Sequence, residues 1–308
     1  MIIIVVASTD CRSRLMLGAL SLFLLLTAGC SSPGGADTGS VHVIAGFYPF
    51  AYVAERVADE NATVTNLTNP GVEPHDLELT LRQVTELGEA DLVIYAAGFQ
   101  PTIDEAIAQN PPQRVLEASD VSLEGEGDAH QDVSLEGDPH LWQDPTMLIP
   151  IAEQLARDLA DADPDHADDY MANAAALAKD LHQLDRDFMA GLANCQRRDI
   201  VTSHAAFGYL ADRYDLTMIA IAGLSPDAEP SLEHLAEIQD LVESRNITTV
   251  FSETLGSKQY AETLAEDLGV TAAVLDPVEG LEDEESNEDY FSLMRKNLEV
   301  LQEANSCT

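Results

Sequence analysis

The sequence predicts an α/β fold in which two parallel-sheet lobes are bridged by one long, rigid α-helix. Two observations lead to this prediction. Short apolar runs alternate with amphipathic segments in both halves of the 308-residue chain, which is typical of βαβ units. Between the halves, a helical pattern runs from residue 165 to about residue 194. At a rise of 1.5 Å per residue, roughly 30 residues span about 45 Å, which is enough to bridge two lobes.

The first half of the chain contains four expected strands and four expected helices. The strands are expected at 41–47, 62–68, 91–96 and 113–117, and the helices at 48–60, 80–89, 101–109 and 145–160. Residues 120–138 contain the near-repeat DVSLEGEGD and DVSLEGD. This stretch is acidic and rich in glycine, so we expect a mobile surface loop there.

The connecting helix and the second half complete the predicted architecture. One apolar stripe recurs at spacings of four, three, four and four, formed by Leu177, Leu181, Leu184, Phe188 and Leu192. Further strands are expected at 199–203, 216–221, 247–252 and 271–275, and helices at 205–213, 231–245, 257–268 and 288–304. We therefore divide the chain into a first lobe at 41–162, a linking helix at 163–194 and a second lobe at 195–308.

The first forty residues have the composition of an export signal followed by a tether. Two arginines precede an apolar run at 15–26, which is too short to cross a membrane, and the run leads into TAGC, ending at Cys30. This pattern resembles a bacterial lipobox, although Thr27 stands where leucine is usual. The resemblance implies a lipoprotein signal peptide at 1–29 and lipid attachment to Cys30; the alternative is a secreted protein without lipid. Residues 30–40 are expected to form a flexible tether.

Two cysteines remain after the tether, Cys195 and Cys307. Outside the cytoplasm such a pair most simply forms one disulfide, and the alternative is two unrelated free thiols. A disulfide here would close a long loop and contribute up to about 4–5 kcal/mol in the chain-entropy model.

The chain is strongly acidic. It has 15 Lys+Arg against 55 Asp+Glu, which gives a formal net charge of −40. Such a surface repels phosphate groups, so nucleic-acid binding is excluded. The acidity is explained either by adaptation to a salty medium or by a role in gathering cations.

Three histidines and one aspartate lie where α/β proteins bind ligands, in loops or just beyond the carboxyl ends of expected strands. They are His75 in GVEPHD, His140 in DPHLWQDP, His204 after VTS, and Asp276 after the last strand. Imidazoles and a carboxylate suit tetrahedral Zn²⁺. Spacings of 65, 64 and 72 residues are too long for a zinc finger, so the fold would have to assemble the site. The alternative is that each histidine is a core residue with satisfied hydrogen bonds.

The order of five motifs resembles a known family. GVEPHDLEL, DPHLWQDP, VTSHAAFGYLADRY, AGLSPDAEPS and LDPVEGL, within about residues 41–307, resemble the metal-binding lipoproteins of ABC importers for zinc and manganese. The resemblance implies a metal site in the cleft between the lobes, with His75, His140, His204 and Asp276 as ligands. Manganese members usually have a carboxylate at the position of His204, so a third imidazole favours Zn²⁺ over Mn²⁺. The cysteine pair also resembles a disulfide of some members.

The resemblance also implies a function. The chain is expected to be a non-enzymatic, high-affinity zinc-binding component outside the cytoplasm, a monomer anchored by lipid to the outer face of the bacterial cell membrane. It would capture Zn²⁺ and deliver it to an ABC permease and its ATPase. The alternatives are an importer component for manganese or iron, a zinc-dependent hydrolase, and a surface adhesin that holds metal structurally. The hydrolase lacks the support of an HExxH pair in the sequence.

Four carboxylates are candidates for orienting the imidazoles: Glu73, Asp76, Glu229 and Glu253. Glu253 ends an apolar strand, so it could also replace Asp276 as the fourth ligand.

Overall fold

The computed structural model describes residues 40–125, 135 and 137–308. The expected signal peptide, the lipid attachment at Cys30 and nearly all of the tether lie outside these residues. The described residues form one compact unit. Within the described residues, none of the helices combines the length and the apolar character that crossing a membrane requires.

The first half of the chain forms a four-stranded parallel sheet with the strand order β2-β1-β3-β4. Its strands are β1 (Val41–Ala45), β2 (Ala62–Asn66), β3 (Leu92–Tyr95) and β4 (Val115–Glu117). Its helices are α1 (Tyr48–Ala58), α2 (Leu81–Glu89) and α3 (Pro101–Gln109). A capping box between Thr80 and Gln83 starts α2.

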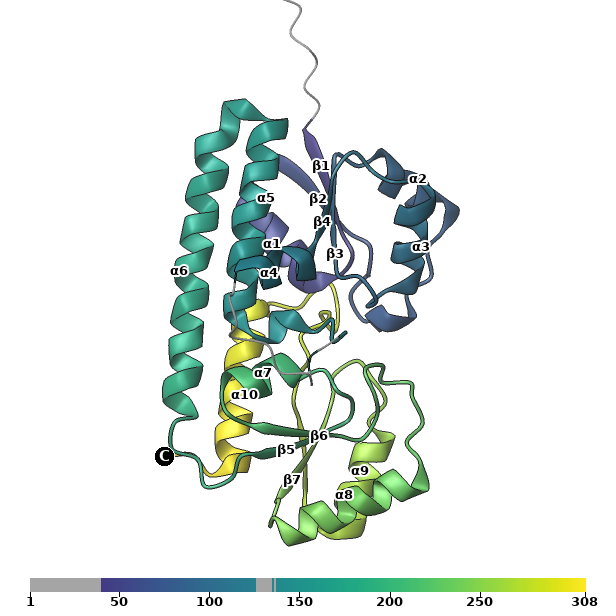
Figure 1. Ribbon diagram of the computed structural model, residues 1–308, viewed down its shortest axis with the longest axis vertical. Helices are drawn as coiled ribbons and strands as arrows, with labels where there is room; N and C mark the ends of the chain where they lie inside the picture. Colours follow the sequence, from purple (N-terminus) through teal and green to yellow (C-terminus); the bar gives the residue numbers. More distant parts are fainter. Residues whose placement is uncertain (1–39, 126–134, 136) are drawn as a thin grey trace, which may run out of the picture. The chain divides into compact units, whose positions relative to one another are not determined.

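Both faces of this sheet are covered, which explains why its central strands β1 and β3 are mostly apolar and buried. Side chains alternate between faces along a strand. Ile44 and Val93 pack in one cluster with Leu87 of α2 and Ile103 of α3, whereas the neighbours of Ile44 and Val93 along their strands belong to a second cluster that includes residues of α1. Figure 1 shows α2 and α3 on one side of the sheet and α1 and α5 on the other.

The second half forms another four-stranded parallel sheet, and its order β6-β5-β7-β8 repeats the order of the first. Its strands are β5 (Asp199–Thr202), β6 (Thr217–Ala220), β7 (Thr249–Ser252) and β8 (Thr271–Val274). Its helices are α7 (Gly208–Arg213), α8 (Leu232–Ser244), α9 (Gln259–Leu268) and α10 (Tyr290–Asn305). Side-chain caps start α8 at Ser231 and α10 at Asp289.

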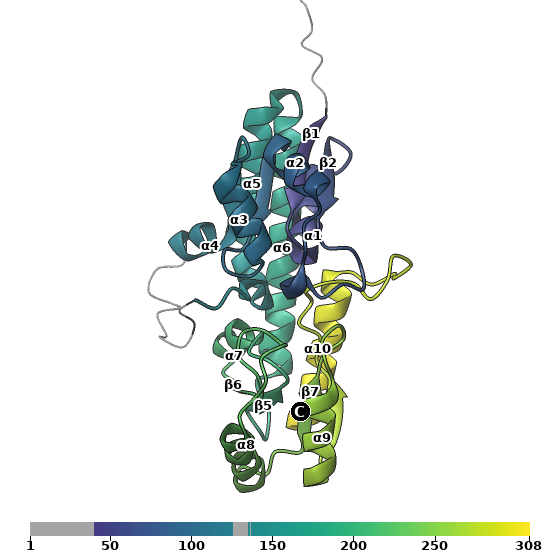
Figure 2. The ribbon, with the colours of Figure 1, turned by 90° about the vertical axis from the view of Figure 1, so that its right-hand side faces the viewer.

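Two long helices join the halves. α5 (Leu148–Ala162) leads into α6 (Ala167–Gly191), which has 25 residues. Figures 1 and 2 show α6 running beside both sheets, with α5 along one part of it and α10 along another. All five residues of the predicted stripe are at most 1% exposed and belong to the largest apolar cluster. The predicted two-sheet fold with a long helix is therefore confirmed.

A disulfide joins Cys195, just after α6, to Cys307, just after α10. The predicted pairing is therefore confirmed. Because the two cysteines are separated by 112 residues, the bond ties the end of α10 to the end of the linking helix.

One prediction about secondary structure is wrong. Residues 120–125 were expected in a surface loop, but Ala118–Gly125 form the helix α4. Its inner side packs on the core, because Ser122 is buried and donates a hydrogen bond to the carbonyl of Met147. The acidic composition of this stretch gives no indication that Ser122 faces the core. Most of the remainder of the expected loop, residues 126–134 and 136, lies outside the described residues, whereas Leu135 and Asp138 are described and buried.

Candidate metal centre

Three imidazoles and one carboxylate converge between the two sheets, in loops near the carboxyl ends of strands. His75 lies in the 3₁₀ turn η1 (Pro74–Asp76), and His140 directly precedes the 3₁₀ turn η4 (Leu141–Gln143). His204 lies two residues beyond β5, and Glu279 lies in the segment after β8. One ligand atom from each of these four residues lies within 4.8 Å of the others.

Glu279 is at the middle of the group. Its Oε1 atom lies 3.7 Å from Nε2 of His75, 3.5 Å from Nε2 of His140 and 3.4 Å from Nε2 of His204. His140, His204 and Glu279 are at most 1% exposed. Within the described part of the chain, neither the three Nε2 atoms nor the Glu279 oxygens have a hydrogen-bond partner. Buried polar groups are normally satisfied, so this arrangement indicates a site for a cation.

The outer nitrogens of two imidazoles face carboxylates. Nδ1 of His140 lies 2.7 Å from Oδ1 of Asp138, and Nδ1 of His204 lies 2.5 Å from Oε1 of Glu253. A proton on Nδ1 that is donated to the carboxylate leaves the Nε2 lone pair directed at the centre, as a metal requires.

The third ring is held by its backbone and by an aromatic neighbour. The backbone amide of His75 donates to the Glu73 carboxylate at 3.3 Å, which caps the η1 turn. The ring of His75 packs against Phe99, with 4.3 Å between ring centroids.

Charges at the centre shift the proton affinities of its members. Burial opposes ionisation of Glu279, but the imidazoles of His204, His75 and His140 outweigh it and hold its pKa well below the usual range. Burial likewise opposes a charge on His204, but Glu253 and Glu279 raise its pKa to about 10. Burial lowers the pKa of His140, and burial together with the Glu279 charge raises the pKa of Glu73 to about 7.

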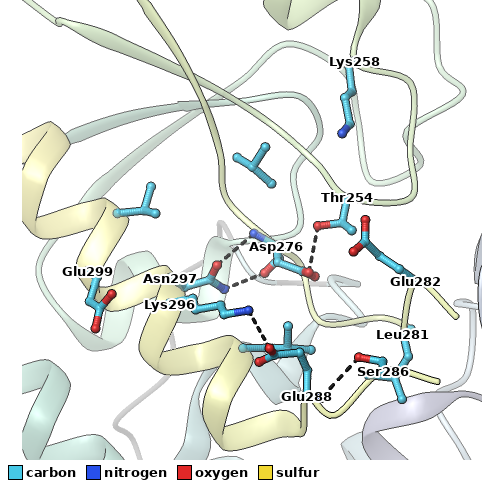
Figure 3. A pocket seen from close by; sticks show the side chains of 14 residues that line it. Thr254, Lys258, Asp276, Leu281, Glu282, Ser286, Glu288, Lys296, Asn297 and Glu299 are labelled. Carbon is cyan, nitrogen blue, oxygen red and sulfur yellow. Dashed lines mark hydrogen bonds and ion pairs between the residues drawn. The ribbon is translucent and has the colours of Figure 1, made fainter. Parts of the chain in front are cut away.

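The structure brings Glu279, rather than Asp276, to the three histidines. Asp276 accepts hydrogen bonds from the Thr254 hydroxyl at 2.8 Å and from the backbone amide of Val278 at 2.7 Å. It lines a separate cavity of about 390 Å³ next to α10. Figure 3 shows its carboxylate directed at Thr254 inside that cavity. The sequence contains the signal for Glu279, since LDPVEGL places it three residues after Asp276, but spacing alone cannot choose between them.

Of the four carboxylates predicted to orient the imidazoles, two contact histidines of the site and two do not. Glu253 faces the outer nitrogen of His204, and Glu73 contacts the backbone of His75. Asp76 and Glu229 are exposed. A hydrogen bond with Asp227 raises the pKa of Asp76.

Sequence reasoning missed Asp138 as a partner of His140. Asp138 Oδ1 also accepts the backbone amide of His140 at 2.9 Å. The DPH motif could have indicated this role, because a carboxylate two residues before a histidine can reach both its backbone amide and its ring.

Comparison with known proteins gives a consistent result. The family model described as ZnuA, zinc-uptake complex component A periplasmic, matches residues 43–304. The zinc-binding lipoprotein AdcA of Streptococcus pneumoniae (strain ATCC BAA-255 / R6) is 34% identical over 92% of this chain and 59% of its own length. The high-affinity zinc uptake system protein ZnuA of Bacillus subtilis (strain 168) is 30% identical over 91% of this chain and 94% of its own. This chain therefore spans a little over half of the AdcA relative.

Solved structures share the fold. The Zn(II)-bound ZnuA-like domain of Streptococcus pneumoniae AdcA superimposes with a TM-score of 0.72 at 33% identity, covering 87% of this chain and 99% of that one. The laminin-binding protein Lbp of Streptococcus pyogenes gives a TM-score of 0.74 at 29% identity, covering 87% of this chain and 100% of that one.

Proposed function

The chain belongs to the zinc-uptake complex component A family, and from that premise we propose that it captures Zn²⁺ outside the cytoplasm and delivers it to the permease of an ABC importer. His75, His140, His204 and Glu279 would bind the ion. Asp276, the fourth ligand expected from the sequence, would not contact the ion.

One observation carries the proposal. Three imidazole nitrogens and one carboxylate oxygen are gathered within 4.8 Å, and inside the described part of the chain they have no hydrogen-bond partners. Three nitrogen donors and one oxygen donor are typical of Zn²⁺, whereas Mg²⁺, Ca²⁺ and Mn²⁺ favour oxygen-rich sets. The donor set therefore supports zinc over manganese as the cargo.

A zinc hydrolase is a weaker candidate. Its metal would need an open position for water, with a base beside it. Here four protein groups already surround the centre, and the carboxylates of Asp138 and Glu253 are engaged with imidazole Nδ1 atoms. The family consists of solute-binding transporter components rather than enzymes.

Native mass spectrometry of the mature protein with Zn²⁺, Mn²⁺ and Fe²⁺ in competition tests the proposal. We expect one Zn²⁺ per chain, lost in His204→Ala and retained in His182→Ala. His182 is the matched control because it is an exposed histidine on α6. Preference for Mn²⁺, or equal loss of zinc in both variants, would overturn the assignment.

The position in the cell is part of the same proposal. Lipid on Cys30 would hold the chain at the outer face of the membrane, next to the permease and its ATPase. Support comes from the TAGC motif and from a relative that is named a lipoprotein. Fractionation of cells that express Cys30→Ser is the test, and we expect the variant to leave the membrane fraction. A variant that stays with the membrane would contradict lipid attachment at this residue.

A further inference from the structure

The segment that carries Glu279 has an unusual backbone. It follows β8 and runs from Asp276 to Gly280. Val278 within it has a φ of 57°. This left-handed conformation is strained for a β-branched residue, so the surrounding contacts must impose it. Val278 is fully buried, and therefore the strain cannot be relieved by movement into solvent.

Asp276 supplies the contact that closes this turn. Its Oδ1 atom accepts the backbone amide of Val278 at 2.7 Å. Its Oδ2 atom accepts the hydroxyl of Thr254, in the loop after β7, at 2.8 Å. One carboxylate therefore links the strained residue to the neighbouring strand.

Asn297 of α10 holds Asp276 in turn. Its side-chain oxygen accepts the backbone amide of Asp276 at 2.9 Å, and its side-chain nitrogen donates to the Asp276 carbonyl at 2.6 Å. Figure 3 shows both contacts beside the bond to Thr254. Asn297 is 2% exposed, so water does not readily replace these bonds.

Pro277, the residue after Asp276, is hydrogen-bonded to residues from the first half of the chain. The carbonyl of Pro277 accepts the indole N–H of Trp142 at 2.8 Å and the side-chain amide of Gln143. Both donors lie in η4, which directly follows His140. The segment that carries Glu279 is therefore attached to the element that positions another member of the site.

From these contacts we propose that Asp276 is a positioning residue for Glu279. Its carboxylate holds Val278 in the left-handed conformation that directs Glu279 to the three imidazoles, and Asn297 fixes Asp276. Asp276 then controls zinc affinity without touching the ion. The inference rests on the proposed function in so far as Glu279 binds zinc; the placement of Glu279 itself does not depend on zinc.

Three variants separate positioning from other roles. Asp276→Ala removes the acceptor for Val278, whereas Asp276→Asn keeps an acceptor oxygen and removes the charge. Glu299→Ala is the matched control, because Glu299 is an exposed carboxylate lining the same cavity on α10. We expect Asp276→Ala to weaken zinc binding by about 10- to 100-fold, as is usual for groups that orient metal ligands. Asp276→Asn and Glu299→Ala should bind like the unchanged protein.

Two further measurements exclude a merely structural role. The visible absorption of bound Co²⁺ reports coordination geometry and should change in Asp276→Ala alone. Crystal structures of the metal-free proteins should show the Glu279 carboxylate displaced from the imidazoles in Asp276→Ala and in place in Asp276→Asn. These structures test the inference even if the unchanged protein binds no zinc, which would refute only the proposed function.

Several outcomes would overturn the inference. One is an undisplaced Glu279 in Asp276→Ala. Another is a lower melting temperature of Asp276→Ala with unchanged affinity and Co²⁺ spectrum. A third is a loss in Asp276→Asn as large as that in Asp276→Ala, because the charge of Asp276 would then matter rather than its hydrogen bond to Val278.

Discussion

In the proposed site, protons and zinc would compete for the same nitrogen of His204. The neighbouring carboxylates outweigh burial and raise the pKa of this imidazole to about 10. The metal-free chain therefore holds a proton there at neutral pH, and an arriving zinc ion would have to displace it. The affinity should fall about tenfold per pH unit as the pH decreases below 10, because one proton competes with zinc at this nitrogen.

Calorimetry of zinc binding in buffers with different ionisation enthalpies, at pH 7, measures the released protons directly. We expect about one proton per zinc at this pH. A binding enthalpy that does not depend on the buffer would contradict this prediction.

The carboxylate of Glu253 should matter although it does not face the centre. It accepts from Nδ1 and the backbone amide of His204 and from the hydroxyl of Ser203. Glu253→Gln weakens the contact that keeps the proton on Nδ1, so we expect zinc affinity to fall about 10- to 100-fold. Competition with a chelating dye measures the change. Glu229→Gln is the control, because Glu229 is exposed; equal effects in both variants would refute the role of Glu253.

The histidines could be predicted from the sequence because each follows a recognisable strand or motif. The choice between Asp276 and Glu279 could not be made in this way. Which of the two carboxylates reaches the imidazoles depends on the φ of Val278, and valine gives no local signal for a left-handed conformation. Bonds from Asp276, Thr254 and Asn297 impose that conformation, and these residues are far apart in the sequence.

At the scale of elements, the periodicity of α6 was the most reliable signal, because one side of the helix is fully buried over several turns. The helix α4 could not be predicted from its acidic composition, because composition does not show that Ser122 is buried against the distant carbonyl of Met147. The boundaries at 162 and 195 between lobes and linking helix stay predictions. The largest apolar cluster includes residues of both sheets and of α6.

The buried stripe of α6 should contribute strongly to the stability of the chain. Leu184→Ala removes a fully buried side chain from the largest cluster, and we expect the free energy of unfolding to fall by about 2–5 kcal/mol. Met189→Ala is the control on the same helix, because Met189 is 45% exposed, and it should change the free energy by less than about 0.5 kcal/mol. Urea unfolding of the metal-free proteins measures both, and equal losses would contradict the role of the stripe.

The charge of the whole molecule should act on the rate of capture. A net charge of −40 attracts divalent cations. Salt screens this attraction, because the Debye length is about 8 Å at physiological ionic strength. Selectivity must come from the buried imidazoles, because surface carboxylates do not distinguish between such cations. We therefore expect the association rate of zinc to fall with added salt while the dissociation rate stays nearly constant.

Stopped-flow mixing with zinc at low and high salt, followed by chelator-induced release, measures the two rates. Sodium perchlorate and sodium chloride should give the same trend, which controls for chloride binding to zinc. A dissociation rate that rises with salt as strongly as the association rate falls would contradict a role for the acidic surface in attracting the ion.

The group of His75, His140, His204 and Glu279 also limits how the protein can evolve. Among the described residues, the buried Nε2 and carboxylate oxygen atoms of this group have no hydrogen-bond partner, and such atoms are a source of local frustration. Side chains that would bind the ion therefore oppose folding without it. Substitutions that removed this frustration would also remove the affinity. At these positions, a substitution that raises the stability of the metal-free chain is therefore expected to lower its affinity for the ion. Substitutions that raise stability without lowering affinity have to lie away from the site, in the core where α6 packs.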